Sequence, residues 1–454
     1  MRIKKIVIQK LFGLFNYNIE LNQDEDITIL TGPNGYGKTT VLNIIYNLFN
    51  QRFFYFQKLN FELISFSFDD TEKRIEVTKK KGKEKTEQII QIINNHQSII
   101  QQTVETADIH ISLFTNNNLT ETFVYNRETE NKLAQELRRF YPVRQLTQDL
   151  WIDERTGKQI TLNEFLNENS NRLSEQIITL IKRQGNDNNT KILQILNDTN
   201  VYLIKEQRLL KQVSDNPNPN SSFINTIEEY AKELKSAIEQ KQLEAYQKAQ
   251  KLDSSFPKRL IECKDFFLSE DDFKKRFAEL TKKQELLQTF GIATTKQEIT
   301  EYNDETRNVL SVYLEDSEEK VRVYDELLSK IELFVNILNE KRFAFKSIII
   351  DGSQGFYFQL SAGQRLNLTD LSSGEQQEIV LLYELLFKTN SNTLILIDEP
   401  EISLHVEWQK HFIGDLQKIA KIKQISFLIS THAPGIINDK WNLTKDLFEL
   451  ANAN

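Results

Sequence analysis

The alternation of apolar and polar side chains changes its period along this chain, and each period indicates a type of element. Alternation with period two is typical of strands with one buried face, and it covers residues 3–9, 17–21, 61–69, 73–78 and 109–114. Continuous apolar runs are typical of parallel strands covered on both faces, and they end at Leu30, Ile397 and Ile429. Apolar residues at helical spacing cover 41–49 and 378–388. The pattern predicts an α/β fold built on a parallel sheet.

The middle of the chain has the pattern of a helical hairpin. Between residues 227 and 252, apolar residues fall on a 4-3 heptad spacing, and Lys241 and Lys248 occupy the two remaining seam positions. Pro257 is expected to end this helix, and a second helical stretch is expected over 298–345. Two antiparallel helices of about 30 residues would form an arm roughly 45 Å long. We expect a head formed by residues 1–140 and 346–454, a mixed insertion over 141–220, and the arm over 221–345.

Composition and charge narrow the class of protein. The 454 residues carry a net charge of −8, so binding to nucleic acid through overall charge is not expected. The lysine-rich segment 79–85 is expected to be a solvated loop, with a contact to nucleic acid or an acidic partner as the alternative. The single cysteine, Cys263, excludes a disulfide framework and a paired-cysteine metal site. No apolar run approaches the roughly 20 residues of a membrane span, so we expect a cytoplasmic protein without membrane contact.

A glycine-rich loop, Gly32-Pro33-Asn34-Gly35-Tyr36-Gly37-Lys38-Thr39-Thr40, lies between a predicted strand and a predicted helix. This is the context that the phosphate-binding pattern G-x-x-x-x-G-K-[ST] requires. The glycines allow backbone N–H groups to face phosphate oxygens, and the start of the helix adds its positive dipole end. We expect a lysine at the β- and γ-phosphates and a threonine hydroxyl on Mg²⁺. The nucleotide-binding candidates are Asn34, Gly35, Gly37, Lys38, Thr39 and Thr40, and Thr39 is also a metal ligand candidate.

Two acidic residues follow the apolar run 393–397 directly. Ligands of open parallel sheets bind at the carboxyl ends of the strands, so Asp398 and Glu399 are placed at the expected edge. Asp398 is the candidate for holding Mg²⁺, directly or through water, and Glu399 for polarising the water that attacks the γ-phosphate. The sequence therefore predicts an ATP site that uses Mg²⁺ and hydrolyses the nucleotide.

Two further motifs complete the candidate site. Ser372, Ser373, Gly374 and Glu375 stand at the start of an apolar helix, where free N–H groups favour an anion. His432 follows the predicted strand 425–429, and at this strand end its side chain can hydrogen-bond the γ-phosphate or the attacking water. An N-cap and a structural histidine are the ordinary alternatives for the two motifs.

These motifs carry a family resemblance. The glycine loop, Leu371-Ser372-Ser373-Gly374-Glu375-Gln376, Asp398-Glu399-Pro400-Glu401 and Ser430-Thr431-His432 resemble an ABC-class ATPase of the SMC/RecF/OLD branch. The resemblance implies a P-loop head with a short coiled-coil insertion, in which two heads sandwich ATP. The Leu371–Glu375 signature of one copy would cover the phosphates held by Lys38 of the other, so a homodimer or larger homo-oligomer is implied. Glu401 to His405 matches the D-loop, and Gln57 is the candidate for the metal-contacting Q-loop glutamine. Ser373 replaces the usual second glycine of the signature, which leaves the hydrolysis rate open.

Within that branch, the turn at Phe12 to Phe15 and the ending at 436–444 are similar to ATPases of bacterial anti-phage defence systems. The ATPases of PARIS-type systems come first in this resemblance, and those of Septu-type systems second. The resemblance implies an ATP-dependent switch and scaffold that senses a phage-encoded trigger. It also implies a partner effector nuclease, with a Toprim type favoured and an HNH type as the alternative.

A DNA-repair ATPase of RecF or SMC type, acting on DNA, is the competing class. The chain has no Cys-x-x-Cys hook in its helical insertion, which disfavours long-range DNA tethering. Only 22 residues follow His432, so we expect no Toprim domain of the kind that OLD-type nucleases carry there. Lys38 and Ser372 are more than 300 residues apart, a spacing unlike that of ABC transporter subunits.

Overall fold

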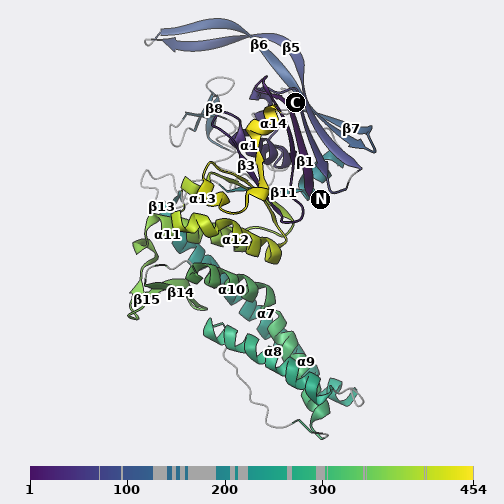
Figure 1. The fold of residues 1–454 in the computed structure, drawn as a ribbon, viewed down its shortest axis with the longest axis vertical. Helices are drawn as coiled ribbons and strands as arrows, with labels where there is room; N and C mark the ends of the chain where they lie inside the picture. Colours follow the sequence, from purple (N-terminus) through teal and green to yellow (C-terminus); the bar gives the residue numbers. More distant parts are fainter. Residues whose placement is uncertain are drawn as a thin grey trace. The chain divides into compact units, whose positions relative to one another are not determined.

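The fold is taken from a computed structural model (Figure 1). Its described residues fall into two compact units: Met1–Glu206, Asn390–Ile402 and Gln409–Asn454 form the first, and Gln207–Thr389 with Ser403–Trp408 form the second. The predicted division into head, insertion and arm stays a prediction. Much of the predicted insertion over 141–220, and Cys263, lie outside the described residues. The structure describes residues 1–70, 72–93, 96–125, 141–145, 150–153, 159–161, 191–204, 210–212, 223–262, 268–292, 302–303, 305–340, 343, 345–402, 404 and 406–452.

A five-stranded parallel sheet forms the centre of the first unit. Its strand order is β11-β17-β18-β3-β19, and every neighbouring pair is parallel. The predicted apolar runs form its three central strands, and β17 is buried along nearly its whole length because helices cover a parallel sheet on both faces. The α/β fold is therefore confirmed. The strands are β3 (Ile27–Thr31), β11 (Asn200–Ile204), β17 (Thr393–Asp398), β18 (Ser426–Ser430) and β19 (Thr444–Asp446).

Helix α1 (Lys38–Phe49) follows β3 and packs against the parallel sheet. Its apolar residues Val41, Ile44, Ile45 and Leu48 are buried, as the spacing in the sequence predicted. None of the helices that the structure describes is long and apolar enough to cross a membrane. The other helices of this unit are α2 (Phe54–Lys58), α6 (Lys191–Asp198), η3 (Pro400–Ile402), α13 (Pro434–Ile437), η4 (Trp441–Leu443) and α14 (Leu447–Asn452), and α12 (Val406–Lys423) begins at the boundary between the units.

A six-stranded antiparallel sheet of order β2-β1-β4-β5-β6-β7 completes the first unit and confirms the strands predicted by alternation. The segment 79–85, however, is not a loop. It lies within β5, which pairs with β6 up to the pair Ile93↔His96, with a bulge between Lys81 and Glu84 (Figure 1). Pairing with β6, the next strand along the chain, overrides the charged composition. The strands are β1 (Ile3–Leu11), β2 (Phe15–Glu20), β4 (Leu63–Phe68), β5 (Lys73–Ile93), β6 (His96–Thr115) and β7 (Asn118–Tyr125), and a separate sheet holds β8 (Val143–Gln145), β9 (Leu150–Asp153) and β10 (Gln159–Thr161).

The second unit combines helices with two small antiparallel sheets, one of order β12-β13 and one of order β14-β15-β16. Helices α7 and α9 run antiparallel. Two ion pairs show this direction: Lys248 pairs with Glu319, and Arg259, which comes later in α7, pairs with Asp316, which comes earlier in α9. Glycine is required in the turn between β14 and β15: a Cβ on Gly355 would lie 1.9 Å from the Ala231 carbonyl oxygen of α7. The elements are β12 (Leu210–Gln212), β13 (Phe223–Asn225), α7 (Thr226–Glu262), α8 (Glu270–Thr289), α9 (Arg307–Arg322), α10 (Asp325–Glu340), β14 (Lys346–Asp351), β15 (Gly355–Leu360), β16 (Arg365–Leu366), η1 (Leu368–Asp370), α11 (Ser373–Tyr383) and the π-helix η2 (Glu384–Lys388).

Two helix predictions in this unit are wrong. Pro257 does not end the first helix, since α7 continues to Glu262. Its last turns are held by Arg259, which pairs with Asp316 of α9 and donates a hydrogen bond to the Leu252 carbonyl at 2.8 Å. The second stretch is divided into α9 and α10 at residues 323–324, and α8 was not predicted. The packing of α8 against α9, which includes the Arg276–Glu318 ion pair, could not be read from local spacing.

Candidate nucleotide-binding site

The glycine loop connects β3 to α1 and has the backbone conformation of an anion site. Gly32, Gly35 and Gly37 have φ values of 135°, 90° and 80°, which residues with side chains rarely adopt. Gly37 is the N-cap of α1, and no side chain of the described residues caps this helix. The first N–H groups of α1 are therefore available to phosphate oxygens, and the helix dipole favours negative charge there. Tyr17 supports the loop from β2, since its hydroxyl donates to the Tyr36 carbonyl at 2.6 Å.

Lys38 is buried at the start of α1, with 6% of its surface exposed. Its Nζ donates to the Gly32 carbonyl at 3.0 Å and contacts Nε2 of His432. Burial lowers the pKa of Lys38, and the nearby carboxylates, Glu399 first among them, oppose this shift. The ammonium group is thus poorly hydrated and close to several negative charges, a setting in which a phosphate can replace its present partners.

Asp398 and Glu399 lie at the carboxyl end of β17, as predicted, and the register sets Asp398 beside Ser430 of β18. The Ser430 hydroxyl donates to the Asp398 carboxylate, and the Glu399 N–H donates to the Ser430 carbonyl at 2.9 Å. Glu399 has a φ of +43°, an uncommon conformation for a glutamate. Its Oε1 lies 3.9 Å from Nε2 of His432. The structure therefore brings Lys38, Glu399 and His432 together at one edge of the sheet.

The remaining candidate residues of the loop differ in their exposure, and their contacts with a nucleotide stay a prediction. Asn34 and Thr39 are exposed, and Thr40 is half-buried in the first turn of α1. Gln57 lies in α2, and its backbone carbonyl accepts a hydrogen bond from Lys79 at 2.6 Å. Its assignment as a metal-contacting residue stays a prediction.

The signature residues belong to the second unit, at the N-terminus of α11. Ser372 is the N-cap, and it forms a capping box with Glu375: the Ser372 N–H donates to Glu375 Oε2 at 2.8 Å, and the Glu375 N–H donates to Ser372 Oγ at 3.3 Å. Lys346 of β14 donates to both carboxylate oxygens of Glu375, at 2.8 and 2.9 Å. Burial raises the pKa of Glu375, but the hydrogen bonds from Lys346 and Ser372 outweigh it and hold the pKa below its ordinary value. Ser373 and Gly374 follow in the first turn of the helix.

Three residues that support the site were not predicted from the sequence: Ser430, Lys346 and Glu401. Ser430 could have been recognised by its place at the end of a central strand. No sequence signal identifies Lys346 as the partner of Glu375. Glu401 accepts hydrogen bonds from Thr431 and His432, a role that its position in the D-loop did not suggest.

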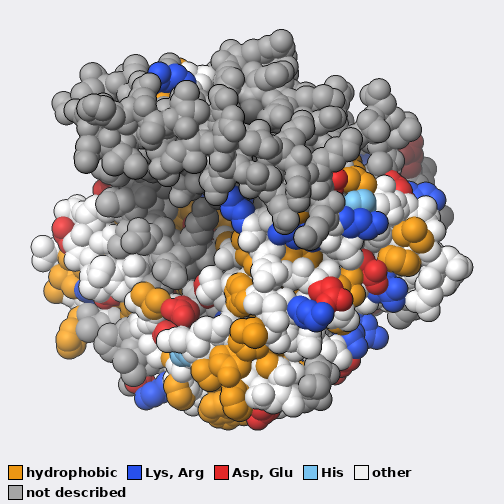
Figure 2. Space-filling view, turned by 90° about the horizontal axis from the view of Figure 1, so that it is seen from above, with side chains coloured by type: hydrophobic (Ala, Val, Ile, Leu, Met, Phe, Trp, Pro, Cys, Tyr) orange, Lys and Arg blue, Asp and Glu red, His pale blue; other side chains and the backbone are white. Residues whose placement is uncertain are grey.

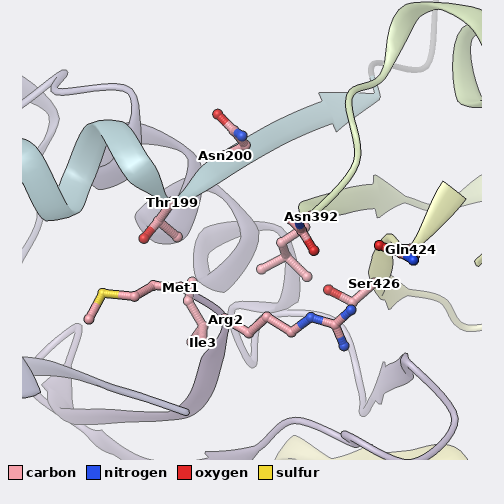
Figure 3. Close-up of a pocket in the computed structure, with 9 residues that line it drawn as sticks. Met1, Arg2, Ile3, Thr199, Asn200, Asn392, Gln424 and Ser426 are labelled. Carbon is pink, nitrogen blue, oxygen red and sulfur yellow. The ribbon is translucent and has the colours of Figure 1, made fainter. Parts of the chain in front are cut away.

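A concavity lies at the opposite end of the strands of the parallel sheet (Figure 3). It is lined by residues at the beginnings of three strands, among them Asn200, Leu394 and Ser426. Arg2 borders it and forms an ion pair with Asp26 at 2.9 Å. Because the glycine loop follows the carboxyl end of β3 and the two acids lie at the carboxyl end of β17, this concavity is separate from the candidate site.

The parallel sheet, the glycine loop after β3 and the acids after β17 define a P-loop ATPase. The profile of the AAA ATPase domain family matches residues 1–437, and the chain belongs to this family. Membership in it implies nucleotide binding and ATP hydrolysis.

Comparison with individual proteins gives more limited likenesses. A "Retron Vc95 probable ATPase" of Vibrio cholerae serotype O1 biovar El Tor is 26% identical over 128 residues, which cover 27% of this chain and 24% of that protein. The chain thus matches about a quarter of that relative's length. Among solved structures, an Smc head domain from Pyrococcus furiosus, bound to the C-terminal domain of ScpA, aligns with a TM-score of 0.33 and 13% identity. The SMC head domain from Thermotoga maritima aligns with a TM-score of 0.31 and 10% identity, and both alignments cover 96% of this chain and 91% of the other.

Proposed function

We propose that this protein binds ATP with Mg²⁺ at the glycine loop and hydrolyses it, and that hydrolysis controls a partner protein. The observation that carries the first part is the convergence of Lys38, Asp398, Glu399 and His432 at the carboxyl edge of the parallel sheet. A phosphate-binding cation, a metal-ligating acid, a second acid and a histidine at one place are the groups that hydrolysis of a phosphoanhydride requires.

Each group has a defined part in this mechanism. The N–H groups of the loop and Lys38 bind the phosphates and orient the γ-phosphoryl group. Glu399 orients the attacking water and accepts its proton, and His432 donates a hydrogen bond to the γ-phosphate or holds the water. The proton acceptor and the hydrogen-bond donor are thus supplied by side chains whose backbones are fixed at the ends of β17 and β18.

Thr39 and Asp398 fit a Mg²⁺ ion. Asp398 is oriented by Ser430, and Thr39 is exposed in the first turn of the helix. No group of three or more His, Cys, Asp or Glu side chains that could hold a metal ion exists among the described residues. In nucleotide sites, Mg²⁺ takes one or two protein ligands and completes its shell with phosphate oxygens and water. When bound, the ion would neutralise charge on the β- and γ-phosphates.

The signature at the N-terminus of α11 supports a second half of the site. In the SMC/RecF/OLD branch that the motifs resemble, such a segment covers ATP held by another copy. We infer that Ser372, Ser373 and Gly374 of one copy contact the γ-phosphate bound to a second copy, so that the functional unit is a homodimer or a larger homo-oligomer. The capping box leaves the remaining first-turn N–H groups of α11 available for an anion.

A role in anti-phage defence is the function that we favour for this switch. It is supported by the partial similarity to a retron ATPase and by the resemblance to PARIS-type (AriA) and, next, Septu-type (PtuA) ATPases. A phage-encoded trigger would alter the ATP-dependent assembly and release an effector nuclease, of Toprim type or alternatively HNH type. In Figure 2, Lys and Arg side chains of the described residues are interspersed with Asp and Glu. This face gives no particular support to the competing function, a DNA-repair ATPase of RecF type.

Substitution of Glu399 by Gln tests the chemistry. We expect Glu399→Gln to bind ATP with near-parent affinity and to hydrolyse it at least about 100-fold more slowly, because an amide cannot accept the proton. The control is Glu449→Gln, which removes an exposed carboxylate of α14 and should leave the rate unchanged. Hydrolysis by Glu399→Gln at the parent rate would exclude the assignment of Glu399.

Other observations separate the two candidate functions. DNA-stimulated, salt-sensitive hydrolysis would favour the repair function, whereas a nuclease gene beside this one would favour defence.

A further inference from the structure

Glu401 connects the two strands that carry the catalytic candidates. It lies in η3, the short turn directly after β17, and its carboxylate reaches the end of β18. Glu401 Oε2 accepts a hydrogen bond from the Thr431 hydroxyl at 2.8 Å, and Oε1 accepts one from the His432 N–H at 2.9 Å. Both carboxylate oxygens therefore accept a hydrogen bond from the two residues that directly follow β18.

The backbone around His432 is fixed by these bonds. Thr431 is fully buried, its N–H donates to the Leu30 carbonyl at 3.1 Å, and its hydroxyl accepts from the Ala433 N–H at 3.0 Å. The His432 imidazole, in contrast, is about one-third exposed and faces Lys38 and Glu399. The described contacts of the imidazole are made to Lys38 and Glu399, which belong to the candidate site. The direction in which the imidazole points therefore depends on the His432 backbone, which donates its N–H to Glu401.

We propose that Glu401 is a positioning residue: it holds the Thr431–His432 peptide so that the imidazole faces the nucleotide phosphates and Glu399. This inference rests on the proposed ATP hydrolysis and adds a residue to it. Misplacement of a reacting group by about 1 Å can reduce a rate by about 100-fold. Loss of the two hydrogen bonds should therefore reduce kcat more than nucleotide affinity.

A second effect of Glu401 has to be separated from this one. Its negative charge also acts on Lys38, where it opposes the lowering of the lysine pKa by burial. Removal of the charge could weaken phosphate binding through Lys38 without moving His432. Thr431→Val separates charge from hydrogen bonding, since it keeps the charge of Glu401 and deletes one hydrogen bond to it, together with the hydrogen bond that the Thr431 hydroxyl accepts from the Ala433 N–H. Thr431→Ser is the matched control, because serine retains the hydroxyl donor.

The first measurement does not depend on turnover. The chain has five histidines, so the imidazole resonances of the isotope-labelled full-length protein can be resolved and His432 assigned by its loss in His432→Asn. A glutamine at position 401 has one acceptor oxygen, and its NH₂ group would face a donor. We expect Glu401→Gln and Thr431→Val to shift the His432 signals and Thr431→Ser to leave them in place. Unchanged His432 signals in Glu401→Gln would overturn the proposal, whether or not the protein hydrolyses ATP.

The second measurement is a double-mutant cycle on hydrolysis. We expect Glu401→Gln to lower kcat about 10- to 100-fold with little change in KM, and Thr431→Val to lower it by less. In a His432→Ala background, Glu401→Gln should have no further effect, because the residue it positions is gone. Multiplicative effects of the two substitutions, or a rise in KM alone, would refute positioning and assign Glu401 to Lys38. A parent protein without hydrolysis would refute the proposed function and leave the resonance test to decide on Glu401.

Discussion

Replacement of Lys346 by methionine should destabilise the start of the signature helix by an amount that the geometry bounds. The Lys346 ammonium contacts both oxygens of Glu375, and the two side chains are 22% and 12% exposed. Removal of one partner from a fully buried ion pair costs about 3–5 kcal/mol, because the other charge stays buried. Here the lysine is partly solvated and Glu375 keeps its hydrogen bond from Ser372, so we expect a loss of about 1–3 kcal/mol in the free energy of unfolding.

The pH dependence of this loss follows from the pKa of Glu375. The pKa is held below its ordinary value of 4.5 in the folded protein, so the pair stabilises the fold at neutral pH, and this contribution is lost as the pH falls through the folded-state pKa. In Lys346→Met, the chief cause of the lowered pKa is absent. The stability difference between parent and variant should therefore be largest at neutral pH and should shrink in acid, below the ordinary glutamate pKa.

Urea unfolding followed by far-ultraviolet circular dichroism, at neutral pH and at several acid values, measures this difference. Lys274→Met is the matched control: it also removes a lysine 2.6 Å from a glutamate, but that pair, with Glu270, is well exposed. It should change the stability by no measurable amount, since exposed pairs are screened by water. A difference for Lys346→Met that is independent of pH, or one no larger than that of the control, would refute the reasoning.

Three further outcomes are expected. Gly363→Ala should lower the free energy of unfolding by about 1 kcal/mol, because alanine is strained in the left-handed backbone conformation. Gly355→Ala should lower it by more than about 3 kcal/mol, because Gly355 has the same φ of +85° and its new Cβ would also overlap a backbone carbonyl. Thermal unfolding measures both losses, and equal losses would contradict the overlap. Lys38→Ala should abolish detectable ATP binding by calorimetry, and parent-like affinity would contradict its role. Asp398→Asn should raise the Mg²⁺ concentration needed for hydrolysis at least about tenfold, and an unchanged requirement would exclude it as a metal ligand.

The elements that the sequence predicted well are those whose signal is local. The apolar runs that end at Leu30, Ile397 and Ile429 became the central strands of the parallel sheet, because only a strand covered on both faces tolerates such continuous apolar character. The glycine loop could also be placed from a local signal, since its glycine spacing and its flanking strand and helix lie within one short segment.

The elements that the sequence analysis missed depend on partners outside the segment itself. The lysine-rich segment 79–85 continues as a strand because β6 supplies a ladder of backbone hydrogen bonds, which composition does not reveal. Helix α7 continues beyond Pro257 because α9 offers Asp316 to Arg259. In both cases tertiary pairing overrides a correct local preference.

In the candidate site, too, the location of the residues could be predicted, whereas the hydrogen bonds that orient them could not. Lys38, Asp398, Glu399 and His432 could be placed at one edge, since the carboxyl ends of neighbouring parallel strands meet there. The hydrogen bonds that orient them, from Ser430 to Asp398 and from His432 and Thr431 to Glu401, depend on the register between β17 and β18. That register is fixed by the packing of the whole sheet.

This register also explains how three neighbouring acids can have different roles. The Asp398 carboxylate accepts a hydrogen bond from the last residue of β18 and the Glu401 carboxylate accepts two from the residues that follow it, whereas the contact of Glu399 with β18 is made by its backbone N–H. Among the described residues, the Glu399 carboxylate accepts no hydrogen bond; its Oε1 lies 3.9 Å from Nε2 of His432, and its charge acts on Lys38. The Ser430 hydroxyl orients the Asp398 carboxylate through Oδ1, which leaves Oδ2 to face a metal ion, whereas both oxygens of Glu401 are engaged in hydrogen bonds that suit positioning. Glu399 combines a fixed backbone with an available carboxylate, and a general base requires both.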